Sequence, residues 1–111
     1  DLRHILTSLG YSGGLKSCET QLDLPKRIGL KDVDGFMAVM LWDYYRKTKN
    51  ESALETLLAY NFEDAVRLEW LMNEAFNQKV SGFKSNPNLI EHRSIPINPF
   101  KANENILRKL S

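Results

Sequence analysis

The sequence contains a single cysteine, Cys18, so no internal disulfide and no site built from several thiolates is available. It also lacks an apolar run of about 18 residues, which argues against a membrane span, and its N-terminal residues do not have the layout of a signal peptide. Lys and Arg number 15 against 14 Asp and Glu, so the formal net charge of +1 gives no global field that would indicate nucleic acid or a membrane. These absences predict a cytoplasmic protein with local charge chemistry, in which Cys18 is a small, partly buried side chain rather than a reactive thiol.

Other familiar binding signatures are also missing. The two histidines, His4 and His92, lie far apart and have no metal-ligand spacing, so both are interpreted as ordinary polar residues. The stretch "GYSGGLK" lacks the spacing of a phosphate-binding loop and is interpreted as a turn between helices. The alternative for this stretch is that Lys16 and nearby backbone N–H groups meet a phosphate at a helix start.

Basic and aromatic residues leave two further alternatives open. The cluster Lys26, Arg27 and Lys31 is interpreted as a solvated loop, with contact to a nucleic-acid backbone as the alternative. Four aromatic residues are interpreted as core rather than as platforms for stacking bases. They are Trp42, Tyr44, Tyr45 and Trp70.

The apolar residues that are present follow helical spacing, and 42% hydrophobic content over 111 residues predicts one compact domain with one core. Short helices are expected over residues 2–9 and 14–24, and a longer one from Val33, with Asp32 or Asp34 as its cap. Residues 50–79 predict a further helix capped by Asn50 or Ser52, long enough to leave room for a break near residues 60–61. The inner face expected for this helix comprises Leu54, Leu57, Leu58, Asn61, Ala65, Leu68, Leu71, Met72 and Ala75.

The helix expected from Val33 is apolar on more than one side. One stripe contains Val33, Phe36, Met40 and Tyr44, and a second contains Met37, Leu41 and Tyr45. A helix that is hydrophobic over so much of its circumference is normally buried, so an additional element is expected to cover it.

The segment after residue 79 has a different character. Gly82, three prolines and an excess of basic residues predict that residues 80–111 form an irregular basic extension. Within it, "SIPINPF" is expected to lie extended and "NENILRKL" to form a last helical turn or two. The alternative is a loosely packed basic tail.

The stretch "AYNFEDAVRLEWL" places Tyr60 and Asp64 one turn apart on one helical face. In two-metal phosphodiester hydrolysis, carboxylates hold the ions, and the ions lower the pKa of the attacking water. A tyrosine hydroxyl beside the carboxylate is able to orient that water. The same spacing is also common on a solvated helix surface, which is the alternative interpretation.

The sequence from residue 1 to about residue 77 resembles the C-terminal half of a ribonuclease-H-like 3′–5′ exonuclease of the DEDD superfamily, of the YprB-like kind. The most specific parts of the resemblance are "YNFED" and the preceding "DVDGFMAVMLW". The tyrosine-bearing branch of that superfamily has Y-x-x-x-D as its last motif. The resemblance implies that Asp64 is a metal ligand, that Tyr60 positions the water, and that two Mg²⁺ or Mn²⁺ ions support stepwise cleavage from a 3′ end of DNA or RNA.

The chain departs from that family in one respect that matters for function. Such enzymes begin with a strand carrying D-x-E, and no D-x-E occurs in these 111 residues. The "DVD" at Asp32 and Asp34 precedes a helix and is not assigned to that role. Because hard divalent ions need several oxygen ligands, the chain alone is expected to be inactive.

These observations predict a mainly α chain that forms the helical C-terminal portion of an α/β ribonuclease-H-like fold, with residues 1–79 in that domain and 80–111 as its extension. The sheet portion, N-terminal to this region, is expected to be missing, so that a helix face is exposed and self-association is promoted. The alternative is a non-catalytic, all-helical module for protein interaction or dimerisation.

Overall fold

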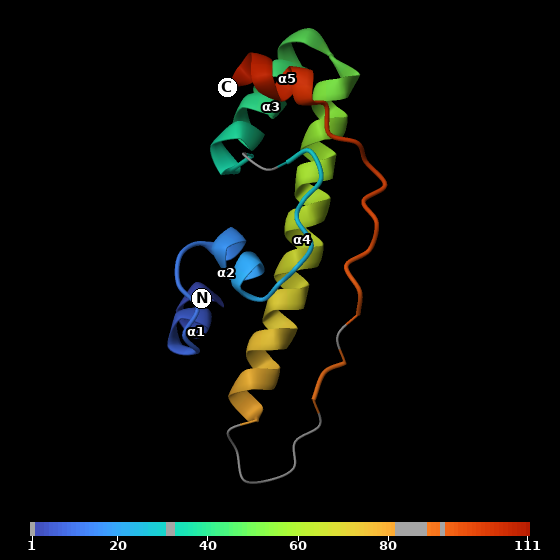
Figure 1. Ribbon diagram of the computed structural model, residues 1–111. Helices are drawn as coiled ribbons and strands as arrows, with labels where there is room; N and C mark the ends of the chain where they lie inside the picture. Colours follow the sequence, from blue (N-terminus) through green and yellow to red (C-terminus); the bar gives the residue numbers. More distant parts are fainter. Residues whose placement is uncertain (1, 31–32, 82–88, 92) are drawn as a thin grey trace. The chain divides into compact units, whose positions relative to one another are not determined.

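The computed structural model describes residues 2–30, 33–81, 89–91 and 93–111 and contains five helices in those residues. They are α1 (Leu2–Ser8), α2 (Leu15–Gln21), α3 (Gly35–Thr48), α4 (Glu51–Val80) and α5 (Glu104–Leu110) (Figure 1). No strand occurs in the described residues, so the expectation of a mainly α chain is confirmed.

The residues group into two compact units rather than one. The first comprises residues 1–25 and 66–96, and the second comprises residues 26–65 and 97–111. Each has its own cluster of buried apolar residues, so the expectation of one core was wrong. The first cluster contains Leu6, Cys18, Leu71 and Ala75, and the second contains Leu30, Val33, Met37, Leu41, Ala53, Ala59 and Tyr60.

Local side-chain chemistry sets where the two longer helices begin. Asp34 caps α3, because its carboxylate accepts a hydrogen bond from the backbone N–H of Met37 at 2.9 Å. Asn50 does the same for α4 by accepting the N–H groups of Ser52 and Ala53. These contacts confirm one member of each predicted pair of caps, and Asp32 lies outside the described residues.

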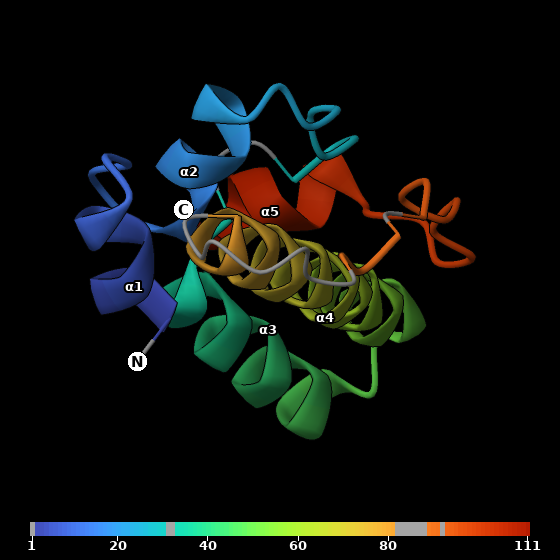
Figure 2. The ribbon, with the colours of Figure 1, turned by 90° about the horizontal axis from the view of Figure 1, so that it is seen from below.

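Helix α4 runs without interruption through Tyr60, so the break that its length allowed is absent (Figure 1 and Figure 2). Its expected inner face was largely wrong, since only Leu71 and Ala75 of the predicted set are buried. Most of the buried positions carry alanine or a polar side chain, and Thr56, Glu63 and Arg67 are hydrogen-bonded there. The buried positions are Ala53, Thr56, Ala59, Tyr60, Glu63, Arg67, Leu71 and Ala75.

The apolar circumference of α3 is only partly covered. Met37 and Leu41 are buried against the second cluster, whereas Phe36 and Val39 are 71% and 65% exposed. Trp42 lies six residues after Phe36 and is 47% exposed. One side of α3 therefore packs within its unit, and the side that bears these three residues remains uncovered in the described residues.

The C-terminal segment is anchored within the second unit. The backbone N–H of Asn103 donates to Oγ1 of Thr56 at 2.8 Å, and the N–H of Lys101 donates to the Glu55 carboxylate at 2.9 Å. Thr56 is fully buried, so this hydrogen bond is shielded from water. Helix α5, which the sequence predicts as a last helical turn or two, packs beside α3.

None of the helices in the described residues combines the length and the apolar composition that crossing a membrane requires.

Candidate functional site

Tyr60 and Asp64 lie on one face of α4, one turn apart, because the helix continues without a break between them. The Tyr60 side chain is buried, and the Asp64 side chain is 47% exposed. The predicted pair is therefore brought together in the fold, with the carboxylate at the surface of the second unit and the aromatic ring inside it.

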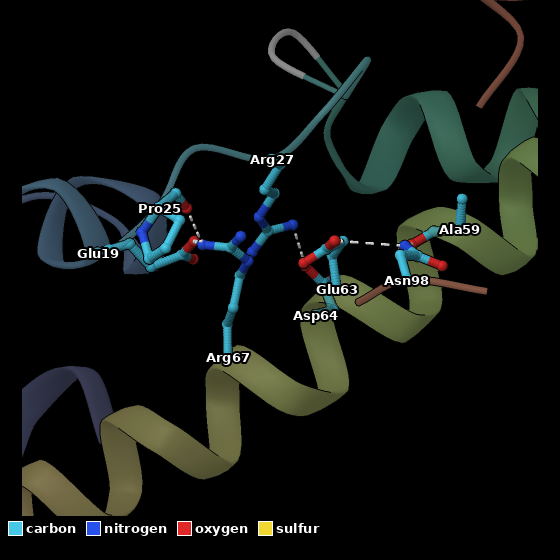
Figure 3. Close-up of polar contacts among 8 residues, drawn as sticks. All are labelled: Glu19, Pro25, Arg27, Ala59, Glu63, Asp64, Arg67 and Asn98. Atoms are coloured by element: carbon cyan, nitrogen blue, oxygen red, sulfur yellow. Dashed lines mark hydrogen bonds and ion pairs between the residues drawn. The ribbon is translucent and has the colours of Figure 1, made fainter. Parts of the chain in front are cut away.

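The partner of Asp64 is Arg27, from the loop that precedes α3. Nη1 of Arg27 donates to Oδ1 of Asp64 at 2.6 Å, as Figure 3 shows. The Arg27 side chain is only 7% exposed. This basic residue of the predicted loop cluster thus turns inward to a carboxylate, whereas its neighbour Lys26 is exposed.

The loop that presents Arg27 is held close to the rest of its unit. Leu30 is 1% exposed and belongs to the core cluster of that unit. Gly29 has a φ of +71°, which side-chain-bearing residues adopt only with strain, and a Cβ at this position would lie 3.3 Å from Cβ of Ala102. A glycine and a buried leucine after Arg27 therefore fix the path of the loop.

The electrostatics of the site keep the Tyr60 hydroxyl protonated. Burial raises the pKa of Tyr60 above its ordinary value, and the Asp64 carboxylate raises it further through its charge and a hydrogen bond. The Asp34 carboxylate adds to this rise, while the Arg27 guanidinium opposes it. The Tyr60 hydroxyl is thus a neutral donor beside Asp64 at physiological pH.

A second polar contact involves Glu63, the residue that precedes Asp64 in α4. Glu63 is buried, and its carboxylate accepts a hydrogen bond from Nδ2 of Asn98 at 3.3 Å. The same amide nitrogen donates to the Ala59 carbonyl at 2.9 Å (Figure 3). Sequence reasoning did not identify Asn98, because nothing local in an irregular segment shows which helix its amide meets. The sequence predicts that Arg27 lies in a solvated loop, with contact to nucleic acid as the alternative, and the burial of its side chain against Asp64 shows that the solvated-loop interpretation was wrong for this residue.

The residues at this site do not by themselves fit a divalent cation. Among the described ranges, no group of three or more His, Cys, Asp or Glu side chains is placed to hold one. Asp64 already accepts a guanidinium, and Mg²⁺ requires about six oxygen ligands. In this arrangement the Asp64 carboxylate binds the Arg27 guanidinium and orients the Tyr60 hydroxyl.

A separate polar contact lies in the first unit. Nη1 of Arg67 donates to Oε1 of Glu19 at 3.1 Å and to the carbonyl of Pro25 at 2.5 Å (Figure 3). The two charged side chains are 3% and 7% exposed. This buried ion pair ties α2 and the chain that follows it to α4.

The other candidate residues are not gathered into a site. His4 is exposed on α1, and Lys16 lies on α2, a helix of 7 residues. Cys18 is buried, and burial raises the pKa of its thiol, as expected for an inert side chain. Lys31 and His92 lie outside the described residues.

The aromatic residues interpreted as core have mixed environments. Trp42 is exposed, whereas Tyr44, Tyr45 and Trp70 are partly buried. The Trp42 and Tyr45 rings lie 5.9 Å apart between centroids, and Nζ of Lys109 lies over the Tyr44 ring. These contacts account for the tyrosines within the fold.

Comparison with known proteins bears on the family. No curated protein and no solved structure matches this chain. The model of the RNase_H_2 family, which is part of the RNase_H superfamily, matches residues 1–76. The match covers most of the chain and includes Arg27, Tyr60 and Asp64, so the chain belongs to the RNase_H_2 family of the RNase H superfamily.

Proposed function

We propose that this chain is the helical part of a metal-dependent 3′–5′ exonuclease that hydrolyses phosphodiester bonds in DNA or RNA, of the tyrosine-bearing, YprB-like kind. The observation that carries the proposal is the Tyr60–Asp64 pair on α4, inside the region that matches the RNase_H_2 family. The phenol and the carboxylate of this Y-x-x-x-D stretch lie one turn apart on the same face of the helix, which supports the proposal.

The proposal places the remaining acidic ligands outside these 111 residues. Members of the RNase H superfamily typically use divalent metals, and Mg²⁺ or Mn²⁺ is the proposed cofactor of the complete domain. Asp64 supplies one carboxylate in this proposal and Tyr60 orients the water that attacks the phosphorus. The chain alone is inactive in this view, because one carboxylate does not satisfy a hard divalent ion. An intracellular location is part of the proposal.

The test is a nuclease assay on a longer protein in which this chain is joined to a segment that carries the D-x-E strand. A single-stranded oligonucleotide labelled at its 5′ end reports stepwise shortening from its 3′ end in the presence of Mn²⁺. Asp64→Asn is expected to reduce the rate by more than about 100-fold, and Tyr60→Phe by a smaller factor. Asp43→Asn is the matched control, since Asp43 is a surface carboxylate on α3 that pairs with Arg46 and Lys47. Equal activity of the Asp64→Asn protein and the control would refute the assignment.

A second candidate is a non-catalytic helical module that binds a partner or a second copy of itself. The observation that favours it is the exposed apolar side of α3, formed by Phe36, Val39 and Trp42. This candidate predicts self-association that depends on concentration and needs no metal, measured by sedimentation velocity. Val39→Glu is expected to abolish the association, and a monomer at every concentration would eliminate the self-association version.

A further inference from the structure

The ion pair at the candidate site is asymmetric in its exposure. The Arg27 side chain is 7% exposed, whereas its partner Asp64 is 47% exposed. Burial penalises a charged group, and an arginine does not relieve the penalty by losing its proton. Arg27 therefore needs a nearby anion more than Asp64 needs a cation.

We infer that Arg27 is the resident cation of this site, so that Asp64 in this chain neutralises a buried guanidinium and does not take up a divalent ion. The inference rests on the proposed function only in treating position 64 as the place where a metal ligand is expected. It concerns a positioning residue, since Arg27 acts on the site through the Asp64 carboxylate.

Geometry excludes a metal ion from the position that Arg27 occupies. Nη1 lies 2.6 Å from Oδ1 of Asp64, and a divalent ion bound to the same oxygen would sit about 2.0–2.6 Å from it. An ion placed there would lie directly against the guanidinium, where like charges repel. The carboxylate does not serve both cations from this side.

The surrounding residues reinforce the pairing. The carboxylate of Asp34, another acidic group near Tyr60, accepts the N–H of Met37 as the cap of α3. The loop that carries Arg27 is also fixed by Leu30 and Gly29, so moving the guanidinium would disturb packed chain. The pair is therefore part of the fold rather than a mobile surface contact.

The test uses the full 111-residue chain, labelled with ¹⁵N, and Mn²⁺ as a paramagnetic probe. Broadening of amide signals is the readout, because a single carboxylate binds a divalent ion too weakly for a reliable binding constant. In the unmodified chain, Mn²⁺ is expected to broaden the signals around position 64 no more than it does in Asp64→Asn. In Arg27→Gln, broadening around position 64 is expected to appear, and it should be lost again in Arg27→Gln/Asp64→Asn.

Two further variants separate the role of the charge from loss of structure. Arg27→Lys keeps a cation and is expected to keep Mn²⁺ away, although it lacks the planar fork of arginine. Lys26→Gln removes an exposed neighbouring charge and is expected to behave like the unmodified chain. Unchanged dispersion of the amide signals outside the loop shows that each variant is folded. If Arg27→Gln is not folded, Arg27→Met takes its place, because it also removes the charge and keeps an unbranched apolar stem.

Two outcomes would overturn the inference. One is broadening that depends on Asp64 in the unmodified chain, and the other is a folded Arg27→Gln chain without any gain of broadening at position 64. Neither outcome depends on nuclease activity. The proposed function fails on a different result, namely retained cleavage by Asp64→Asn in the longer protein, so the two failures are distinguishable.

Discussion

The buried ion pair between Arg67 and Glu19 gives the sharpest prediction about stability. Both side chains are almost fully buried, and the guanidinium also donates to the Pro25 carbonyl. Glu19→Ala removes the carboxylate that pairs with Arg67 and leaves the guanidinium buried, with the Pro25 carbonyl among its remaining contacts. Breaking one side of a buried pair costs about 3–5 kcal/mol, and the remaining carbonyl contact places the expected loss near the lower figure.

The expected loss is large on the scale of a small protein, whose free energy of unfolding is about 5–15 kcal/mol. Urea unfolding followed by far-ultraviolet circular dichroism measures it, and a slope of about 1–2 kcal/mol per molar urea converts a loss of about 3 kcal/mol into a midpoint lower by about 1.5–3 M. Glu69→Ala is the matched control, since Glu69 is an exposed glutamate on the same helix, α4.

The double variant Glu19→Leu/Arg67→Met tests the reasoning itself. Replacing both charges with apolar side chains removes the desolvation cost together with the attraction, so its stability is expected to lie much closer to that of the unmodified chain than the single variant's does. The reasoning is refuted if Glu19→Ala lowers the free energy of unfolding by less than about 1 kcal/mol, or if the double variant is as unstable as the sum of both single changes.

Three other predictions concern single groups. Burial raises the pKa of the Cys18 thiol, so iodoacetamide at pH 8 should react at least about tenfold more slowly with the folded chain than with the urea-unfolded chain, and equal rates would contradict this. Burial and the Asp64 charge raise the pKa of Tyr60, so the folded state holds the phenol proton more tightly than the unfolded state does. The contribution of this proton to the free energy of unfolding is fully present below about pH 10 and is lost as the pH rises through the folded pKa. Tyr60→Phe should flatten that decline in urea unfolding measured at successive pH values, and an unchanged slope would argue against it. Asp34→Ala removes the side-chain acceptor for the Met37 N–H and should cost about 1 kcal/mol by the same denaturation method, whereas an unchanged midpoint would show that the cap contributes nothing.

The helices were largely predictable because their signals are local. Apolar spacing, the caps Asp34 and Asn50 and the turn glycines act over three or four residues, and the structure has helices where these signals place them. The sequence predicts a helix over residues 50–79 but leaves open a break near residues 60–61, since length alone does not decide whether a helix breaks. Residues 59–62 contain neither proline nor glycine, the residues that most often interrupt a helix.

The face of α4 that is buried could not be read from hydrophobicity. Leu58 and Leu68 are substantially exposed, whereas Thr56, Glu63 and Arg67 are buried. A polar side chain is buried at low cost only when a partner arrives from elsewhere in the chain, and hydrophobic pattern carries no information about such partners. Hydrogen bonds and ion pairs with distant parts of the chain therefore determine which face of α4 is buried.

At the candidate site, the sequence by itself determined that Tyr60 and Asp64 share one helical face, because helical periodicity fixes the relation of residues four apart. Only the tertiary structure decided that Arg27, 37 residues away, is the partner of Asp64 and that Asn98 meets Glu63. The physical reason is that an ion pair depends on the path of a loop, which is set by the packing of Leu30 and the backbone of Gly29 rather than by the charges themselves.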